Sequence, residues 1–176
     1  ADANFDCPDH PPDIPGSGYP AEKLPASGSV FRVEKAGWPF LFPVVLAGEY
    51  NNVTCEGQRI SGASLLAWPE ATQTCTEVAI LGAAENGSAE TDLKLEYEDA
   101  STESVKLTFP DWCASPAPDD IIAASAPYRY TRDPQAGRSI RQDIDCHIYF
   151  RRVPVDTTRR LAAIVLPEKS NLHIFA

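Results

Sequence analysis

Aromatic residues beside polar turns are the side chains of this sequence best suited to holding a sugar. Trp68, Trp112, Tyr128 and Tyr130 carry flat rings, which pack against the C–H faces of sugars. Core packing is the competing interpretation, and we favour it for Trp112 because that residue precedes Cys113. Arg129 joins the set as a contact for an acidic glycan. We predict these five residues as the ligand-binding site.

Arg129 also belongs to a group of arginines in the second half of the chain, while the first half is acidic. Such a distribution can orient an anionic partner. Charged residues also decorate exposed strand edges, where they discourage pairing with other chains. We favour that second interpretation for the group as a whole.

Catalytic signatures are weak, and we predict no catalytic residue. A glycosidase needs two carboxylates about 5 to 10 Å apart, but 25 acidic residues make some such pair unavoidable. The sequence has no Gly-X-Ser-X-Gly motif, as a serine hydrolase would require. His10, His147 and His173 are too far apart in sequence for a metal-binding histidine pair. A small secreted glycan hydrolase remains a minor alternative.

Three aspartates could serve a structural role in place of a catalytic one. Asp111, Asp119 and Asp120 offer oxygen ligands for calcium, although they lack the Asp-X-Asp-X-Asp spacing of a calcium loop. Solvated loop charges are the favoured interpretation. We therefore predict no cofactor and keep structural calcium open.

Five cysteines without Cys-X-X-Cys spacing indicate disulfides in place of a zinc site. We predict one bridge between Cys113 and Cys146 and another between Cys55 and Cys75, although other pairings are possible. Cys7 is then left free or forms an intermolecular bridge, which also makes a homo-oligomer a prediction to test.

Several features favour a secreted protein. The chain lacks methionine, and no apolar run approaches the ~20 residues that a membrane helix needs, so we expect no membrane insertion. Sequons at Asn52 and Asn86 offer glycosylation sites on turn-like segments. The formal net charge of −10 opposes binding to nucleic acid and to anionic lipid. Carbohydrate or glycoprotein is the expected partner.

The elements that would position these residues are strands. Apolar residues alternate over 93–98 and 105–109 around a short turn, which predicts a hairpin with one buried face. Residues 29–33 and 38–43 predict another hairpin, and residues 63–68 are the best helix candidate. We predict one domain over 1–176, an all-β antiparallel two-sheet sandwich of jelly-roll type. Its proline-rich leader, about 7–28, is expected to be irregular.

Short strand and turn motifs follow one another over most of the chain. They are Asn4–Asp6, Asn51–Val53, Gly57–Gln58, Leu81–Ala84, Asn86–Gly87, Ser101–Ser104, Phe109–Trp112, Ala126–Arg129, Val153–Asp156 and Leu172–Phe175. In this order they resemble a β-sandwich accessory domain of secreted bacterial glycoside hydrolases, including α-mannosidase-like and α-fucosidase-like enzymes. The five cysteines, the leader and the segment from Leu65 to Thr76 depart from that pattern.

The resemblance implies association with carbohydrate, without catalysis by this domain, and that the chain is one part of a larger enzyme. The rival hypothesis is a structural or protein-interaction domain that packs on a catalytic neighbour or on another copy of itself.

Overall fold

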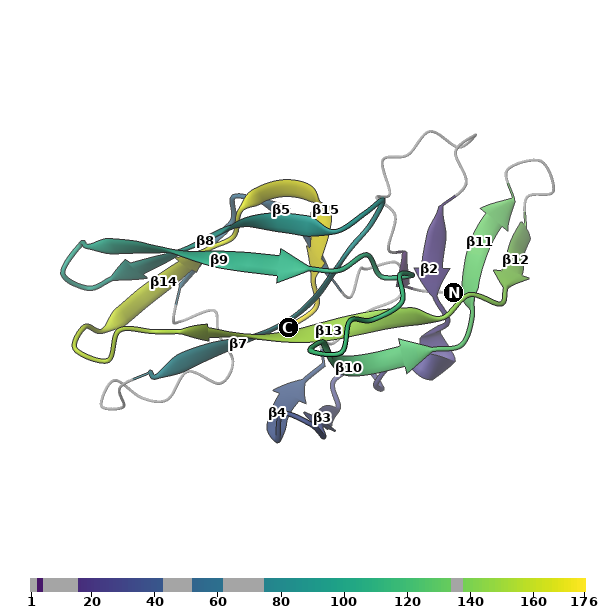
Figure 1. The fold of residues 1–176 in the computed structure, drawn as a ribbon, viewed down its shortest axis with the longest axis horizontal. Coiled ribbons are helices and arrows are strands. Elements are labelled where there is room, and N and C mark those ends of the chain that lie inside the picture. Colours follow the sequence, from purple (N-terminus) through teal and green to yellow (C-terminus); the bar gives the residue numbers. More distant parts are fainter. Residues whose placement is uncertain (1–2, 5–15, 43–51, 62–74, 134–137) are drawn as a thin grey trace.

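The computed structural model describes residues 3–4, 16–42, 52–61, 75–133 and 138–176, and strands dominate these segments (Figure 1). The largest sheet has the order β10-β13-β7-β15-β5. Its strands are β10 (Ile121–Ala126), β13 (Cys146–Pro154), β7 (Glu77–Ala84), β15 (Glu168–Ile174) and β5 (Val53–Glu56). All of its strand pairs are antiparallel.

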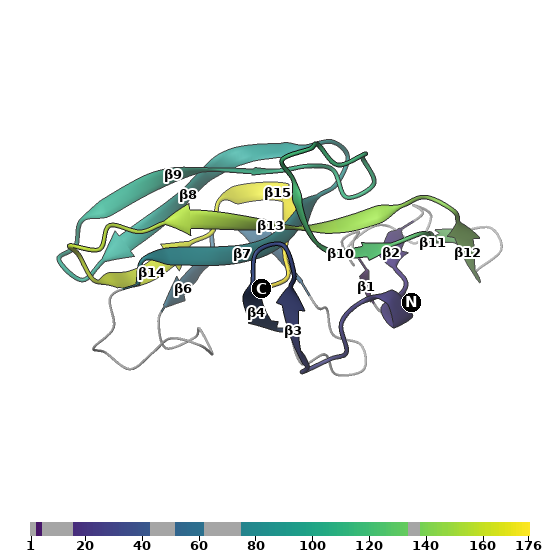
Figure 2. The same cartoon turned by 60° about the horizontal axis from the view of Figure 1, so that its bottom comes forward.

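A second antiparallel sheet, in the order β6-β14-β8-β9, forms the other main layer. Its strands are β6 (Arg59–Ser61), β14 (Leu161–Val165), β8 (Ala89–Tyr97) and β9 (Thr102–Phe109). Figure 2 shows β8 and β9 lying over β13 and β7 as stacked layers, and contacts join β9 to both. The predicted all-β, antiparallel sandwich is therefore confirmed.

Alternation along the strands builds the core between these layers. On β8, Leu93, Leu95 and Tyr97 are buried while Lys94 is exposed, because successive side chains of a strand point to opposite faces. From the opposing layer, Leu172 is fully buried on the face toward β9, whereas Phe150 of β13 is buried on the other face of that layer, against Trp38 and Phe40. The hairpin predicted around residues 93–109 is confirmed, with Leu93 facing Val105 across β8 and β9.

Two small sheets extend the sandwich. The first has the order β1-β2-β11-β12, and the second is the hairpin β3-β4, which confirms the other predicted hairpin. Their strands are β1 (Ala3–Asn4), β2 (Ser17–Tyr19), β11 (Arg129–Asp133), β12 (Arg138–Gln142), β3 (Val30–Val33) and β4 (Trp38–Leu41). Figure 1 shows β2, β11 and β12 together at one end of the molecule, away from the turns of β8 and β14.

The leader is more regular than expected in its described part. Ser17–Tyr19 forms β2, and Ala21–Lys23 forms the 3₁₀ turn η1. β2 is a strand because its backbone pairs with β11, more than 100 residues away, as Tyr130 opposite Gly18 shows. The candidate helix at 63–68 lies outside the described residues. Among the described helices, none combines the length and the apolar character that crossing a membrane requires.

Candidate functional site

The predicted ligand residues that the structure describes come together at the end of the sandwich formed by β2, β11 and β12. Tyr128, Arg129 and Tyr130 lie at the start of β11, and Trp112 lies on the loop after β9. The Arg129 guanidinium lies 5.5 Å from the centre of the Trp112 ring. Trp68, the other predicted ligand residue, lies outside the described residues.

Trp112 belongs to the core of this end. Its side chain is only 3% exposed, and its ring meets that of Tyr19 edge to face at 4.9 Å between centroids. Backbone hydrogen bonds fix it on both sides: its N–H donates to Ala84 O at 2.8 Å, and its carbonyl accepts from His147 N at 2.7 Å. A sugar therefore cannot stack on the Trp112 ring in this structure, and the core interpretation describes it best.

Tyr130 lies on β11 and Tyr128 directly precedes this strand. The two side chains lie on one face of the small sheet, because they are two residues apart along an extended backbone. Their rings meet edge to face at 5.7 Å. Tyr128 is 8% exposed, since the Arg141 guanidinium covers its ring at 3.9 Å. Tyr130 is half-buried and directly opposite Arg141 on β12. Among the described members of the predicted set, Tyr130 is therefore the one that offers aromatic surface to a ligand.

Glu22 completes this face, although no sequence motif indicates that it lies there. The Tyr128 hydroxyl donates to the Glu22 carboxylate across 106 positions of sequence. This hydrogen bond raises the pKa of Tyr128 to about 12 and lowers the pKa of Glu22. Only the pairing of β2 with β11 brings the two residues together, so no local sequence signal could have identified the contact.

The opposite face of β11 carries Arg129 and Thr131, and it lies against two thiols. Gln142, which is opposite Arg129 on β12, accepts from Arg129 Nε at 2.8 Å and from the Thr131 hydroxyl at 2.9 Å. Arg129 Nη1 lies 3.6 Å from Cys113 Sγ. Cys113 Sγ and Cys146 Sγ are 3.1 Å apart, so the two residues of one predicted disulfide are neighbours as thiols.

The environment makes the two thiols unequal. A hydrogen bond from Cys146 and the nearby charge of Arg129 lower the pKa of Cys113, and burial opposes them. The pKa of Cys146 is raised, first by that hydrogen bond and then by burial. Cys113 is half-buried, whereas Cys146 at the start of β13 is fully buried. When one of the two thiols loses its proton, the negative charge therefore lies on Cys113.

Cys55 and Cys75 are also thiols in the structure, and the bridge between them stays a prediction. Cys55 is buried on β5, and burial raises its pKa to about 12. Cys75, which is half-buried, donates to the Glu77 carbonyl at 3.3 Å. Cys7, predicted as an unpaired cysteine or an intermolecular link, lies outside the described residues.

The two sequons differ in accessibility. Asn86 is an exposed turn residue with a φ of 53°, between strands β7 and β8. Asn52 is half-buried, and its Oδ1 lies 2.9 Å from Nδ1 of the buried His173. Asn86 is therefore the residue that a glycosylating enzyme could reach more easily.

Two of the three aspartates considered for calcium, Asp111 and Asp120, serve other contacts. Asp111 accepts from the backbone N–H groups of Gly87 and Cys113, at 2.7 and 2.8 Å. Asp120 pairs with Arg151 at 2.6 Å, while Asp119 lies nearby on the same loop. Within the segments that the structure describes, no group of three or more His, Cys, Asp or Glu side chains could hold a metal ion.

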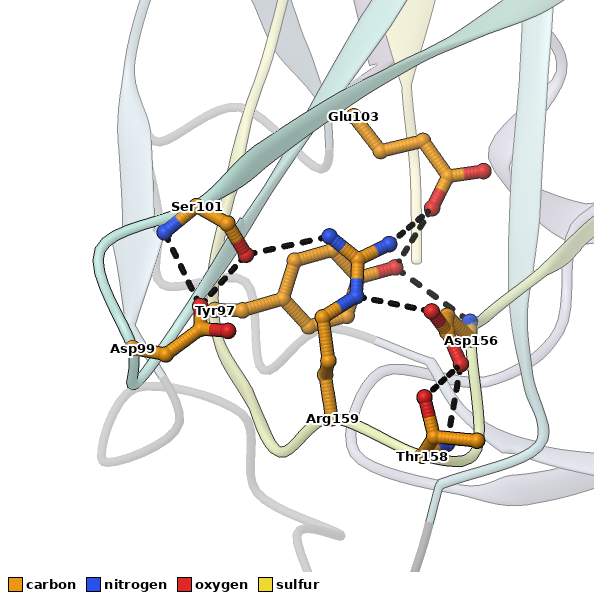
Figure 3. A network of polar contacts seen from close by, with 7 residues as sticks. All are labelled: Tyr97, Asp99, Ser101, Glu103, Asp156, Thr158 and Arg159. Atoms are coloured by element: carbon orange, nitrogen blue, oxygen red, sulfur yellow. Dashed lines mark hydrogen bonds and ion pairs between the residues drawn. The ribbon is translucent and has the colours of Figure 1, made fainter.

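A second polar cluster lies at the far end of the sandwich and closes on itself (Figure 3). Arg159 donates to Asp156 at 2.8 Å, to Ser101 at 3.0 Å and to Glu103 at 3.1 Å. Its guanidinium also stacks on Tyr97, 3.8 Å from the ring centre. These contacts tie the turn between β8 and β9 to the turn between β13 and β14. The cluster has a structural role, since the Arg159 donors already bind Asp156, Ser101 and Glu103.

Comparison with known proteins places the chain in a family without naming an activity. No curated protein matches it. The family model for the AziU2-like β-sandwich domain matches residues 6–176, which agrees with the layered antiparallel sheets described above. That match supports a β-sandwich family and does not supply the glycoside hydrolase setting that the sequence motifs suggested. The chain belongs to the AziU2-like β-sandwich domain family.

Proposed function

We propose that this chain is a non-catalytic, secreted β-sandwich module that associates with carbohydrate through the face of β11 and β12 that carries Tyr130. The observation behind the proposal is the direct pairing of half-buried Tyr130 with exposed Arg141 across these two strands. An aromatic ring beside a guanidinium suits a sugar, which presents apolar C–H groups and hydroxyl oxygens together. The resemblance to accessory domains of glycoside hydrolases supports the same assignment.

Each residue of this face has a distinct part. Tyr130 supplies the platform for a sugar ring. Arg141 donates through Nε to Asp143 at 2.8 Å, so its two Nη groups supply the donors to hydroxyl or carboxylate oxygens. Tyr128 supports both, since it packs against the Tyr130 ring and beneath the Arg141 guanidinium. Glu22 fixes the Tyr128 hydroxyl. The arginine favours an acidic glycan over a neutral one, because a charge-assisted hydrogen bond is stronger than a neutral one.

A glycan array probed with the labelled 176-residue chain tests this proposal. We expect retention on a subset of glycans, with acidic glycans among them, and loss of that retention in Tyr130→Ala. Arg141→Ala should weaken binding to acidic glycans most. Arg160→Ala is the matched control, since Arg160 is an exposed arginine that pairs with Glu98 near the opposite end of the sandwich. If no glycan is retained, or if Tyr130→Ala binds as well as the wild type, the proposal fails.

The non-catalytic and secreted parts of the proposal need their own measurements. Incubation with chromogenic glycosides should give no turnover, and hydrolysis of any of them would restore the minor alternative of a small glycan hydrolase. Expression through a eukaryotic secretory pathway should add a glycan at Asn86 in preference to Asn52, because Asn86 is exposed. A mass spectrum with Asn52 modified and Asn86 unmodified would contradict that expectation.

A structural or protein-interaction domain is the second candidate, and one observation favours it. Val30 and Leu41 are directly opposite each other on the β3–β4 hairpin and remain 71% and 41% exposed. An outward-facing apolar pair on a two-stranded sheet is suited to packing on a second copy of the chain. Sedimentation velocity at rising concentration should then show a dimer that Val30→Asp abolishes. A monomer at all concentrations would remove the form of this candidate in which the chain packs on another copy of itself.

A further inference from the structure

The thiol pair is held in place by backbone hydrogen bonds from both of its segments. Trp112, which precedes Cys113, accepts a hydrogen bond at 2.7 Å from the N–H of His147, which follows Cys146. The Cys113 N–H donates to Asp111 Oδ1 at 2.8 Å. The 3.1 Å separation of the two sulfur atoms therefore comes from the fold itself, with 33 positions of sequence between the residues.

The surroundings of the two sulfur atoms differ in access and in charge. Cys113 is half-buried and faces Nη1 of Arg129 at 3.6 Å. Cys146 is fully buried, and its thiol lies 3.3 Å from the carbonyl oxygen of Ile144. A thiolate is the nucleophile in thiol–disulfide exchange, and a neighbouring cation stabilises it. An incoming disulfide would therefore meet Cys113 first.

We propose that Cys113 and Cys146 form a thiol–disulfide exchange site that reacts with small disulfides, Cys113 being the attacking thiolate and Cys146 the resolving thiol. This inference does not rest on carbohydrate binding. It goes beyond a structural bridge, because it assigns an order of reaction to the two cysteines and a role to Arg129.

The reaction balances with a small disulfide, RSSR, as the oxidant. Cys113 Sγ attacks one sulfur of RSSR, so that the bond Cys113–S–SR forms and RS⁻ leaves. Cys146 releases its proton to solvent and attacks Cys113 Sγ, which breaks the mixed disulfide and expels a second RS⁻. The two cysteines together lose two electrons, and RSSR gains them as two thiolates. The fixed sulfur–sulfur contact favours the second step, because the resolving thiol is already adjacent.

Arg129 acts in this scheme as a positioning residue for the charge on Cys113. Its Nε is fixed by Gln142, so the guanidinium presents Nη1 to the sulfur without free rotation. Lysine at this position would retain a positive charge but would lack the planar guanidinium with its paired N–H donors, and glutamine would remove the charge. The pKa of Cys113 is lowered first by the hydrogen bond from Cys146, and the charge of Arg129 acts in the same direction.

Incubation of the reduced 176-residue chain with oxidised glutathione, followed by peptide mapping in a mass spectrometer, tests the proposal. The wild type should form the Cys113–Cys146 disulfide. Cys146→Ser should accumulate glutathione on Cys113, whereas Cys113→Ser should carry none on Cys146. Circular dichroism of each variant checks that it is folded. Glutathione on Cys146 in Cys113→Ser, or none on Cys113 in folded Cys146→Ser, would overturn the assignment.

The rate of alkylation by N-ethylmaleimide as a function of pH tests the part assigned to Arg129. Arg129→Gln should slow Cys113 several-fold at neutral pH and move its titration midpoint upward, while Arg129→Lys should restore much of the rate. Cys75 is the internal control, because it is also half-buried and burial raises its pKa. An unchanged pH profile for Cys113 in Arg129→Gln would refute the role, as would an equal slowing of Cys75.

Discussion

Two buried tyrosines allow a matched test of how the core beneath the thiol pair is held together. Tyr19 and Tyr149 are 1% and 0% exposed, so replacing either by phenylalanine removes a hydroxyl and leaves the buried ring. The Tyr19 hydroxyl donates to the carbonyl oxygen of His147 at 2.8 Å. Among the described residues, the contacts of the Tyr149 hydroxyl are long, 3.4 Å to Asp111 O and 3.5 Å to Ala114 O. Hydrogen bonds weaken steeply at such lengths.

The magnitudes follow from that difference. Tyr19→Phe loses a good buried hydrogen bond, which costs about 1 to 2 kcal/mol of the free energy of unfolding. For a chain of this size that loss lowers Tm by roughly 2 to 8 °C. Tyr149→Phe loses little that was well bonded, so its cost should lie within about 0.5 kcal/mol of zero. Only the hydroxyl geometry separates the two substitutions.

Urea unfolding at neutral pH with reductant present measures both values by tryptophan fluorescence. Trp112 reports on Tyr19 directly, because the two rings are 4.9 Å apart. Wild type, Tyr19→Phe and Tyr149→Phe should give parallel transitions with only the midpoint of Tyr19→Phe clearly lowered. If Tyr149→Phe costs as much as Tyr19→Phe, hydroxyl geometry does not govern the stability of this end and the reasoning is wrong.

Two further predictions concern the sheet β10-β13-β7-β15-β5. Burial raises the pKa of Cys55 from 9.0 to about 12, so its contribution is intact below pH 9 and is lost as pH rises toward 12. Between pH 8 and 10 the wild type should lose about 1 kcal/mol more unfolding free energy than Cys55→Ala in urea titrations with reductant, and equal losses would contradict this. Gly82→Ala would place its Cβ 2.9 Å from the backbone oxygen of His173 and 3.0 Å from Phe109 Cζ. It should cost about 1 to 3 kcal/mol by the same assay, and an unchanged midpoint would show that the sheets can separate there without cost.

The strands that could be predicted are those whose own side chains alternate. Residues 93–97 have an apolar residue at every second position, and this pattern indicates which face of the strand is buried. β2, with the sequence Ser-Gly-Tyr, has no such alternation of apolar residues and lies in a proline-rich stretch. Its strand conformation depends on pairing with β11, which local propensity cannot show. The proline content of the leader predicts an irregular segment, but this local signal does not include the pairing with β11.

The site could be predicted in its residue types and not in its arrangement. Tyr128 and Tyr130 were selected as aromatic residues beside polar turns and Arg129 as a contact for an acidic glycan, and Cys113 and Cys146 were predicted as a pair. Which of these side chains are covered depends on distant partners, such as Tyr19 against Trp112 and Arg141 over Tyr128. The position of Trp112 beside Cys113 favoured its burial, but the sequence could not show which ring covers it or that Tyr130 stays half-buried, because tertiary contacts decide both.

Strand alternation at β11 separates the two proposed activities while placing them on the same element. Tyr130 faces the side covered by Arg141, whereas Arg129 and Thr131 face Gln142 and the thiols. A substitution on one face should therefore leave the other face intact, provided that β11 keeps its pairing with β2 and β12. Tyr130→Ala should abolish glycan retention without slowing the reaction of Cys113, and Arg129→Gln should slow Cys113 without changing glycan retention. If either substitution impairs both, the two faces are coupled through the sheet, and the small sheet must be treated as one site.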